Sequence, residues 1–202
     1  GSSIKENARF HRAQECVFKS DVENFFGSIP DFWVFELFHE LGYTKSISRL
    51  LAGLCCKDGV LPQGAATSGY LSNIYMVQFD EEMFAHCRSN MLRYTRYADD
   101  IAISGAGIEL EATKAVVTKL LKDRKLTINL RKTRVQRQNS RQKITGVVVN
   151  DRLGPDRQFV RRIRQDLYYI EKFGVHGHAR QRGFKSPLSC INNLLGRITS
   201  AE

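Results

Sequence analysis

Short apolar runs along the chain predict a set of β-strands. Residues 15–21 form one such run, and it ends at an acidic side chain, Asp21. Residues 92–97 and 101–104 are apolar-rich runs on either side of Ala98, Asp99 and Asp100, which is the pattern of a β-hairpin. Further strand-like pieces cover residues 126–130, 134–138 and 143–149.

Helical patterns separate these runs. Pro30 stands near the start of an apolar segment that Gly42 is placed to end, and residues 46–56 predict a second helix. A longer helix is expected from about Thr67 and an amphipathic one over residues 109–122. The longer helix would carry on one face Leu71, Ile74, Tyr75, Phe79 and Met83. From Phe159 the tail predicts helices separated by a loop at 174–178. This order favours an α+β fold, with helices packed on one face of an antiparallel sheet.

The composition is that of an ordinary globular protein. Of 202 residues, 42% are hydrophobic and 26% are charged, and this length provides one domain with a core, or one domain and part of another. No stretch reaches the roughly 20 apolar residues that span a bilayer, and no secretion pattern opens the chain. Five cysteines without framework spacing favour reduced thiols. We therefore expect a cytoplasmic protein without a membrane partner.

Positive charge gathers in the second half of the chain. Residues 1–100 carry 10 Lys/Arg and 13 Asp/Glu, whereas residues 101–202 carry 21 and 8. Such a concentration favours a polyanionic partner, above all nucleic acid. A solvated charged face would have the same composition, so charge alone leaves both interpretations open.

Three carboxylates carry the candidate chemistry. Asp21 ends an apolar strand, and Asp99 and Asp100 lie in the turn of the predicted hairpin. If these strands are neighbours, the carboxylates converge and repel one another unless cations neutralise them. Oxygen ligands favour Mg²⁺ or Mn²⁺, and two such ions about 3.5–4 Å apart form a clamp for attack at phosphorus. The alternative is that the two adjacent aspartates only make a turn, to which Asp is well suited.

Three motifs, in the order in which one enzyme family has them, favour the metal site over a simple turn. Residues 97–100 (Tyr-Ala-Asp-Asp) resemble the Y-x-D-D signature of reverse transcriptases. Residues 18–29 resemble the first metal-binding motif of these enzymes, and residues 61–73 resemble their template- and nucleotide-positioning motif. Residues 7–11 fit the N-A-x-x-H element of retron enzymes, and Ile-Thr-Gly at 144–146 fits their V-T-G element with Ile for Val.

This resemblance implies the polymerase palm of a bacterial retron-type reverse transcriptase, with additional C-terminal helices. The implied reaction is attack of a primer 3′-hydroxyl on the α-phosphate of a dNTP with release of pyrophosphate. Two Mg²⁺ ions, which Mn²⁺ can replace, are the implied cofactors. The implied partners are an RNA template, a DNA or RNA primer and a cognate noncoding RNA. An accessory effector protein and a role in antiphage defence belong to the same expectation.

The resemblance also implies roles for single residues. Asp21 and Asp99 would hold the metal ions, with the Val22 carbonyl as a further ligand and Asp100 in support. Asp21, Asp99, Asp100 and Lys132 are the expected catalytic residues, with Lys132 beside the leaving pyrophosphate. A solvated lysine in a basic run is the alternative for Lys132.

The expected nucleotide-binding residues are Phe26, Gln63 and Gly64. Phe26 would collide with a ribose 2′-hydroxyl and so select deoxynucleotides, unless it is a core aromatic beside Phe25. Gly64 would permit close backbone approach. The expected nucleic-acid-binding residues are Arg131, Arg134, Arg137, Arg141 and Lys143.

The same resemblance predicts how the chain is divided into segments. Residues 1–14 would be a remnant of the fingers, residues 15–155 the palm, and residues 156–202 a basic helical segment leading toward a missing thumb. Ala66 and Gly69 stand where the family usually has proline, which loosens that loop. With the fingers reduced, we expect the chain alone to bind nucleic acid and metal but to polymerise poorly.

Other assignments stay open on the sequence. A group II intron or abortive-infection reverse transcriptase would share most of these motifs. A non-catalytic nucleic-acid-binding module could keep the palm as a scaffold. A signalling cyclase with a related palm is disfavoured by the motif around Gln63 and by Phe26.

Overall fold

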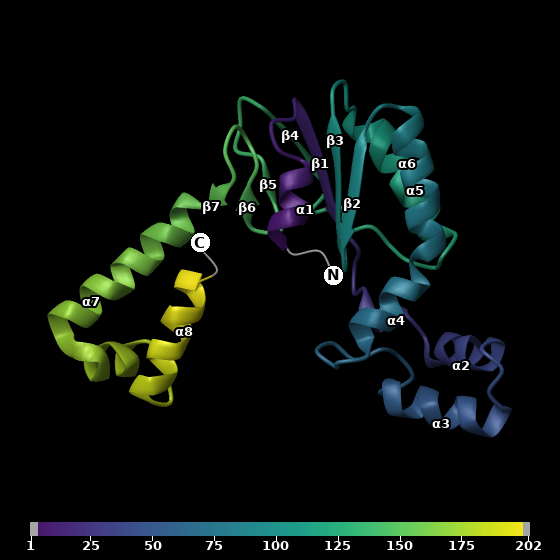
Figure 1. Cartoon of the computed structure of the whole chain (residues 1–202), viewed down its shortest axis with the longest axis horizontal. Coiled ribbons are helices and arrows are strands. Elements are labelled where there is room, and N and C mark those ends of the chain that lie inside the picture. The colour runs from purple at the N-terminus through teal and green to yellow at the C-terminus, as the bar shows by residue number, and fades with distance from the viewer. Residues whose placement is uncertain (1–3, 200–202) are drawn as a thin grey trace. The chain divides into compact units, whose positions relative to one another are not determined.

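The computed structural model describes residues 4–199 and divides into two compact units (Figure 1). One unit comprises Gln14–Ser140, and the other comprises Gly1–Ala13 together with Arg141–Glu202. Among the described residues, no helix is long and apolar enough to cross a membrane.

An antiparallel sheet of four strands organises the Gln14–Ser140 unit. Its strands are β1 (Cys16–Asp21), β2 (Arg93–Tyr97), β3 (Asp100–Gly105) and β4 (Arg134–Arg137). They lie in the order β2-β3-β1-β4, so β1 and β3 are the central pair. In their register Asp21 faces Asp100 at one end of the sheet.

One face of this sheet is covered by helices, because alternate strand residues are apolar there. Phe18 of β1 and Ile103 of β3 are fully buried in the main core. Phe79 and Met83 of α5 (Val77–Ser89) and Val117 of α6 (Leu110–Lys122) belong to the same core. Figure 1 shows α5 and α6 beside the sheet. The predicted α+β class is therefore confirmed.

The remaining helices of this unit are α2 (Asp31–Glu40), α3 (Lys45–Cys55) and α4 (Ser68–Tyr75), with a short 3₁₀ turn at Phe26–Ser28. The long helix predicted from Thr67 is in fact two helices, α4 and α5. Met76 lies between them with φ −91° and ψ 0°, and its side chain is fully buried. The apolar pattern runs through this break, so the sequence alone does not reveal it.

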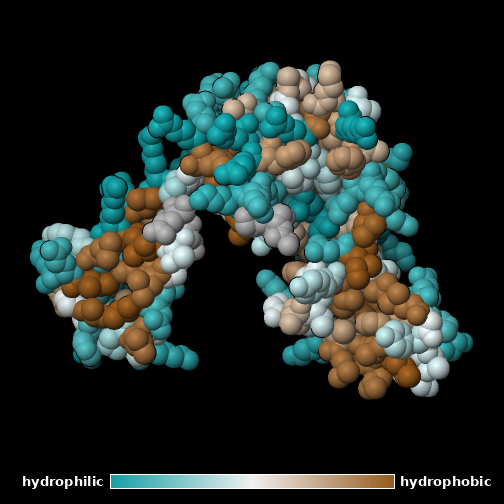
Figure 2. Space-filling model, in the orientation of Figure 1, coloured by the Kyte–Doolittle hydropathy of each residue, from teal (hydrophilic) through white to brown (hydrophobic). Residues whose placement is uncertain are grey.

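Exposed apolar side chains gather on the small helices. Figure 2 shows hydrophobic residues over the region of α2 and α3. Leu41, Leu50 and Leu54 are each more than 60% exposed there, and Tyr70 of α4 is 79% exposed. No described residue covers this surface.

The unit that holds both termini combines a small sheet with helices. Its elements are α1 (Ile4–Phe10), β5 (Lys143–Ile144), β6 (Val147–Val148), β7 (Gly154–Pro155), α7 (Arg157–Gln181) and α8 (Pro187–Thr199). After α1, the Ala13 amide donates to the carbonyls of Val149 and Asn150, which ties the N-terminal segment to the sheet β5-β6-β7. This contact attaches residues 4–13 to the segment that begins at Arg141, so both belong to the same compact unit.

Two local expectations are wrong. Residues 126–130 form no strand, only a single bridge between Ile128 and Val22. The loop expected at 174–178 reduces to a kink at Gly174, where φ is 74° and ψ is 159° inside α7. Glycine tolerates this positive φ without the Cβ clash that other residues suffer, so one residue suffices for the break.

Candidate functional site

The end of β1 and the β2–β3 turn bring the three predicted carboxylates together. Asp21 ends β1 and pairs with Asp100, the first residue of β3. The Val22 amide donates to the Asp99 carbonyl at 3.0 Å, which ties the chain after β1 to the turn. Tyr97 pairs with Asp100, so the turn consists of Ala98 and Asp99 alone. Ala98 has φ 52°, the positive value that two-residue hairpin turns require.

A cavity of about 460 Å³ opens beside this turn. Among its lining residues are five that the sequence singled out: Val22, Phe26, Gln63, Asp99 and Lys132. They come from the end of β1, the 3₁₀ turn, the loop before α4, the hairpin turn and the loop before β4. Asp21, Asp100 and Gly64 do not line it.

Other residues of the cavity wall were missed by sequence reasoning, namely Asn24, Lys57, Asp58 and Asn129. The backbone amide of Asn129 donates to the backbone carbonyl of Asp21 at 2.8 Å, which fixes the position of Asn129. Lys57 and Asp58 belong to a tight turn, in which Lys57 and Val60 exchange backbone hydrogen bonds. Asn24 lies within the first metal-binding motif, whereas the Lys57–Asp58 turn and Asn129 lie outside the three motifs, and tertiary packing brings them to the cavity.

The three carboxylates have different surroundings. Asp100 Oδ2 lies 2.9 Å from Lys19 Nζ, whereas its Oδ1 is buried with no hydrogen-bond partner in the described structure. Burial raises the pKa of Asp100; Lys19 opposes the rise, and the charges of Asp21 and Asp99 add to it. Asp21 Oδ1 lies 3.7 Å from Lys132 Nζ. The Asp99 side chain makes no hydrogen bond or ion pair with the described residues.

These donors suit a hard divalent cation. Carboxylate and carbonyl oxygens are the ligands of Mg²⁺ and Mn²⁺. The unpartnered Asp100 Oδ1 and the free Asp99 carboxylate are groups that a nearby cation would stabilise. The backbone amides of Glu23 and Asn129 donate to the carbonyls of Thr127 and Asp21, and no backbone amide of the described residues donates to the Val22 carbonyl. Within residues 4–199, no group of three Asp, Glu, His or Cys side chains is close enough to form a metal site as it stands.

The nucleotide-binding candidates differ in burial. Both phenylalanines line the cavity, but Phe25 is buried in the core at 4% exposure, whereas its neighbour Phe26 is half-buried. Their rings lie 5.3 Å apart at an interplanar angle of 53°. Gly64 has φ 89° in the loop that presents Gln63, and no atom lies within 4 Å of a Cβ built there. The backbone angle, rather than crowding, therefore favours glycine at this position.

The predicted nucleic-acid-binding residues fall into two groups. Arg131, Arg134 and Arg137 are exposed in and just before β4. Arg141 and Lys143 belong to the other unit, and each lies 2.9 Å from an oxygen of Asp156. The carboxylate partly neutralises this second pair, so the first group presents the less compensated charge.

The chain resembles known reverse transcriptases in sequence. Residues 1–149 match the family described as reverse transcriptase (RNA-dependent DNA polymerase). The retron Ec86 reverse transcriptase of Escherichia coli is 33% identical over 170 residues, covering 83% of this chain and 53% of the relative. The retron Mx65 reverse transcriptase of Myxococcus xanthus is 33% identical over 217 residues, covering 98% and 49%. This chain thus spans about half the length of these relatives, and it belongs to the reverse transcriptase family.

Proposed function

We propose that this chain carries the catalytic site of a retron-type RNA-directed DNA polymerase. The observation that carries the proposal is the cavity beside the β2–β3 turn, where Asp99, Phe26, Gln63 and Lys132 meet from four separate segments. Family membership and the similarity to retron reverse transcriptases point to the same chemistry. The proposed substrates are a dNTP and a primer paired to an RNA template.

Asp21, Asp99 and the Val22 carbonyl would hold two Mg²⁺ ions, with Asp100 in support. Bound there, the ions would lower the pKa of the primer 3′-hydroxyl and stabilise charge on the phosphoryl oxygens. Lys132 would add positive charge beside the leaving pyrophosphate, because its ammonium group reaches the cavity next to Asp21. Gln63 would contact the nucleotide, since it lines the same cavity as Asp99.

The basic surfaces would bind the template and primer through their phosphates. Arg131, Arg134 and Arg137 serve this role in the Gln14–Ser140 unit, with Arg141 and Lys143 contributing in the other. The retron type further suggests a cognate noncoding RNA as template. An accessory effector protein and a role in antiphage defence stay predictions from the resemblance, and a cytoplasmic location stays a prediction from the composition.

A non-catalytic nucleic-acid-binding palm is the second candidate. The observation in its favour is the ion pair between Lys19 and Asp100, in which an ammonium group already neutralises one of the three carboxylates. Such a pair would let the fold persist without a bound metal ion. Catalysis and scaffolding therefore predict different consequences for loss of the Asp99 charge.

One-nucleotide addition to a primer on an RNA template separates the two. We expect the chain to add a dNTP under single-turnover conditions with Mg²⁺ or Mn²⁺, and EDTA to abolish the addition. Asp99→Asn should reduce the rate at least about 100-fold, since charge stabilisation of this kind contributes factors of that size. Asp123→Asn is the matched control, because Asp123 is exposed at the end of α6 and does not line the cavity. Primer binding without any metal-dependent addition would favour the scaffold.

A further inference from the structure

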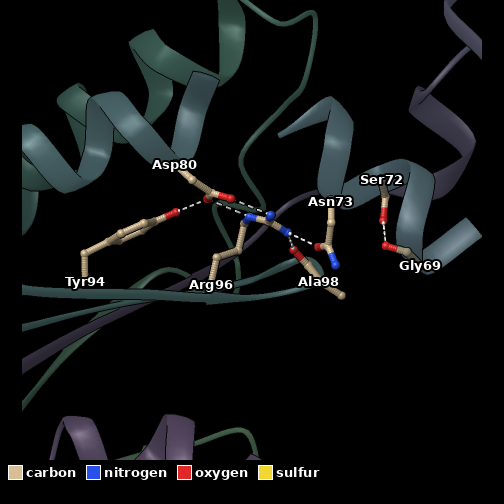
Figure 3. A network of polar contacts seen from close by, with 7 residues as sticks. All are labelled: Gly69, Ser72, Asn73, Asp80, Tyr94, Arg96 and Ala98. Atoms are coloured by element: carbon tan, nitrogen blue, oxygen red, sulfur yellow. Dashed lines mark hydrogen bonds and ion pairs between the residues drawn. The ribbon is translucent and has the colours of Figure 1, made fainter. Parts of the chain in front are cut away.

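Arg96 joins three segments of the Gln14–Ser140 unit (Figure 3). Its side chain is only 5% exposed. The guanidinium grips Asp80 of α5 with two hydrogen bonds, from Nε to Oδ1 at 2.8 Å and from Nη2 to Oδ2 at 2.6 Å. Nη1 points the other way and donates to the Ala98 carbonyl at 2.9 Å and to Asn73 Oδ1 at 3.2 Å. One side chain thus contacts α5, α4 and the hairpin turn.

The hydrogen bond from Arg96 to Ala98 affects the orientation of the backbone that carries the Asp99 side chain. Ala98 has φ 52°, a conformation that a residue with a Cβ adopts only when its surroundings hold it there. The Ala98 carbonyl belongs to the peptide unit that leads into Asp99, so a hydrogen bond to it fixes the plane of that peptide. Arg96 therefore restrains the backbone from which the Asp99 carboxylate reaches the cavity.

The contact with Asn73 leads to a second segment that lines the cavity, the loop of Gln63. Asn73 lies in α4, the helix that follows the loop presenting Gln63. The first residue of α4, Ser68, donates from its hydroxyl to the Pro62 carbonyl at 2.7 Å, so this loop is fastened to the helix. A continuous set of hydrogen bonds and backbone therefore connects Gln63 to Asp99, with Arg96 as its central link.

A purely structural ion pair would not need these contacts. The chain supplies such a pair for comparison on the same helix, where Arg124 Nη2 lies 2.8 Å from Glu82 Oε1 of α5 and the arginine side chain is 10% exposed. The Arg124 guanidinium also donates to the Leu120 carbonyl in α6 and lies 6.0 Å from the centre of the Phe79 ring of α5, and none of these partners belongs to the turn. Only an arginine fork can serve Asp80 and the turn together, since a lysine ammonium is a point charge without that planar geometry.

We propose that Arg96 is a positioning residue that holds Asp99 and the Gln63 loop in register, so that metal ion and nucleotide meet in one geometry. This inference rests on the proposed function, because it assumes that Asp99 binds the metal ion. Groups that orient metal ligands typically change metal affinity about 10–100-fold when they are removed. Arg96 changes metal affinity by a factor of this size through Asp99, without itself contacting the metal ion.

A Mn²⁺ titration of the whole 202-residue chain, with free Mn²⁺ measured by electron paramagnetic resonance, tests this role. Asp99→Asn first identifies the site, as the binding that this variant loses. Arg96→Met should weaken that binding about 10–100-fold. Arg96→Lys keeps the charge but loses the fork, and should still weaken binding at least about fivefold. Arg124→Met, which removes a matched ion pair, should change it less than about twofold.

Thermal unfolding of each variant shows whether it is folded, and Arg96→Lys serves as the test if Arg96→Met is not. Equal Mn²⁺ affinity in folded Arg96→Lys and wild type, or equal losses in the Arg96 and Arg124 variants, would overturn the positioning role and leave the proposed function standing. A wild-type chain without any Asp99-dependent Mn²⁺ binding would overturn the proposed function, and the inference with it.

Discussion

Phe25 and Phe26 are adjacent in sequence but have different surroundings. Both line the cavity, but Phe25 is buried in the core, whereas Phe26 is half-buried. An aromatic ring at the edge of a nucleotide site can exclude a sugar by its bulk alone. The position of Phe26 therefore supports the proposed selection against ribonucleotides.

Replacement of Phe26 by valine should relax sugar selection. Because the smaller side chain makes room for a 2′-hydroxyl, we expect rNTP use relative to dNTP to rise about tenfold or more, the scale of discrimination by a few missing carbons. The ratio of kcat/KM for rNTP and dNTP measures the effect. Phe38→Val is the control, since Phe38 is a partly buried aromatic residue that packs against the same core without lining the cavity, and it should leave the ratio unchanged. A folded Phe26→Val chain with unchanged selectivity would make Phe26 a packing residue only.

At the scale of elements, a buried carboxylate joins the helical segments of the terminal unit. The Asp166 side chain in the first part of α7 is 5% exposed. It accepts hydrogen bonds from Arg182, which follows α7, and from Arg197 of α8. His178 Nε2, beyond the kink at Gly174, lies 3.3 Å from it. These contacts hold the kinked α7 and α8 together.

Asp166→Asn should therefore destabilise the helical segment. Loss of the charge weakens the hydrogen bonds to two guanidinium groups, although the asparagine carbonyl oxygen can still accept, and hydrogen bonds to charged groups contribute about 1.5–3 kcal/mol each. We expect the free energy of unfolding to fall by about 2 kcal/mol, as measured by urea denaturation with far-UV circular dichroism. Asp151→Asn, on an exposed residue of the same unit, should change it by less than about 0.5 kcal/mol.

The same carboxylate predicts a pH dependence. Burial alone would raise the pKa of Asp166, but hydrogen bonds from Arg182 and Arg197 outweigh it and lower the pKa below its usual value. Its contribution to stability is then complete above the unfolded pKa of about 4 and is lost as pH falls through the lower folded pKa. Wild type and Asp166→Asn should converge in stability in this acidic range. A constant difference between them down to pH ~2.5 would contradict the assignment.

The sequence predicts the strands that carry the site better than the segments around them. The ends of β1 and the β2–β3 hairpin follow from local patterns, since apolar runs and turn residues act over a few positions. The break at Met76 and the loss of a strand at residues 126–130 depend on tertiary packing, which overrides local preference.

In the candidate site, too, residues within motifs could be predicted, whereas contacts made by tertiary structure could not. Asp99, Phe26 and Gln63 could be predicted because motifs carry them. The ion pair between Lys19 and Asp100 requires the register of β1 against β3, and the place of Asn129 requires the path of a loop. The spacing of residues along the chain shows neither contact, although Asn129 stands only three residues before Lys132.

At the scale of the whole molecule, the net positive charge is divided unevenly between the two units, because most acidic residues lie in one of them. Residues 14–140 carry 16 Lys/Arg and 15 Asp/Glu, whereas residues 1–13 and 141–202 carry 15 and 6. Arg157, Arg161 and Arg164 of α7 are exposed. The net charge therefore favours phosphate binding by the terminal unit, in addition to the arginines near β4.

Salt dependence can apportion binding between these surfaces. For a single-stranded nucleic acid, each phosphate contact contributes about −0.7 to the slope of log K against log salt. Replacement of Arg131, Arg134 and Arg137 by glutamine should reduce the slope by about 2, and the same change at Arg157, Arg161 and Arg164 should do likewise. Fluorescence anisotropy at several salt concentrations measures both. A triple variant with unchanged affinity and slope would identify its surface as merely solvated.

Anomalous diffraction from crystals soaked with Mn²⁺ and a dNTP tests the central claim most directly. The account predicts Mn²⁺ peaks beside the β2–β3 turn, within about 2.0–2.3 Å of oxygens of Asp21, Asp99 and the Val22 carbonyl. The dNTP should lie in the cavity between Phe26 and Gln63. Mn²⁺ peaks only elsewhere, with Lys19 still paired to Asp100 and the cavity without nucleotide, would contradict a polymerase site at this turn.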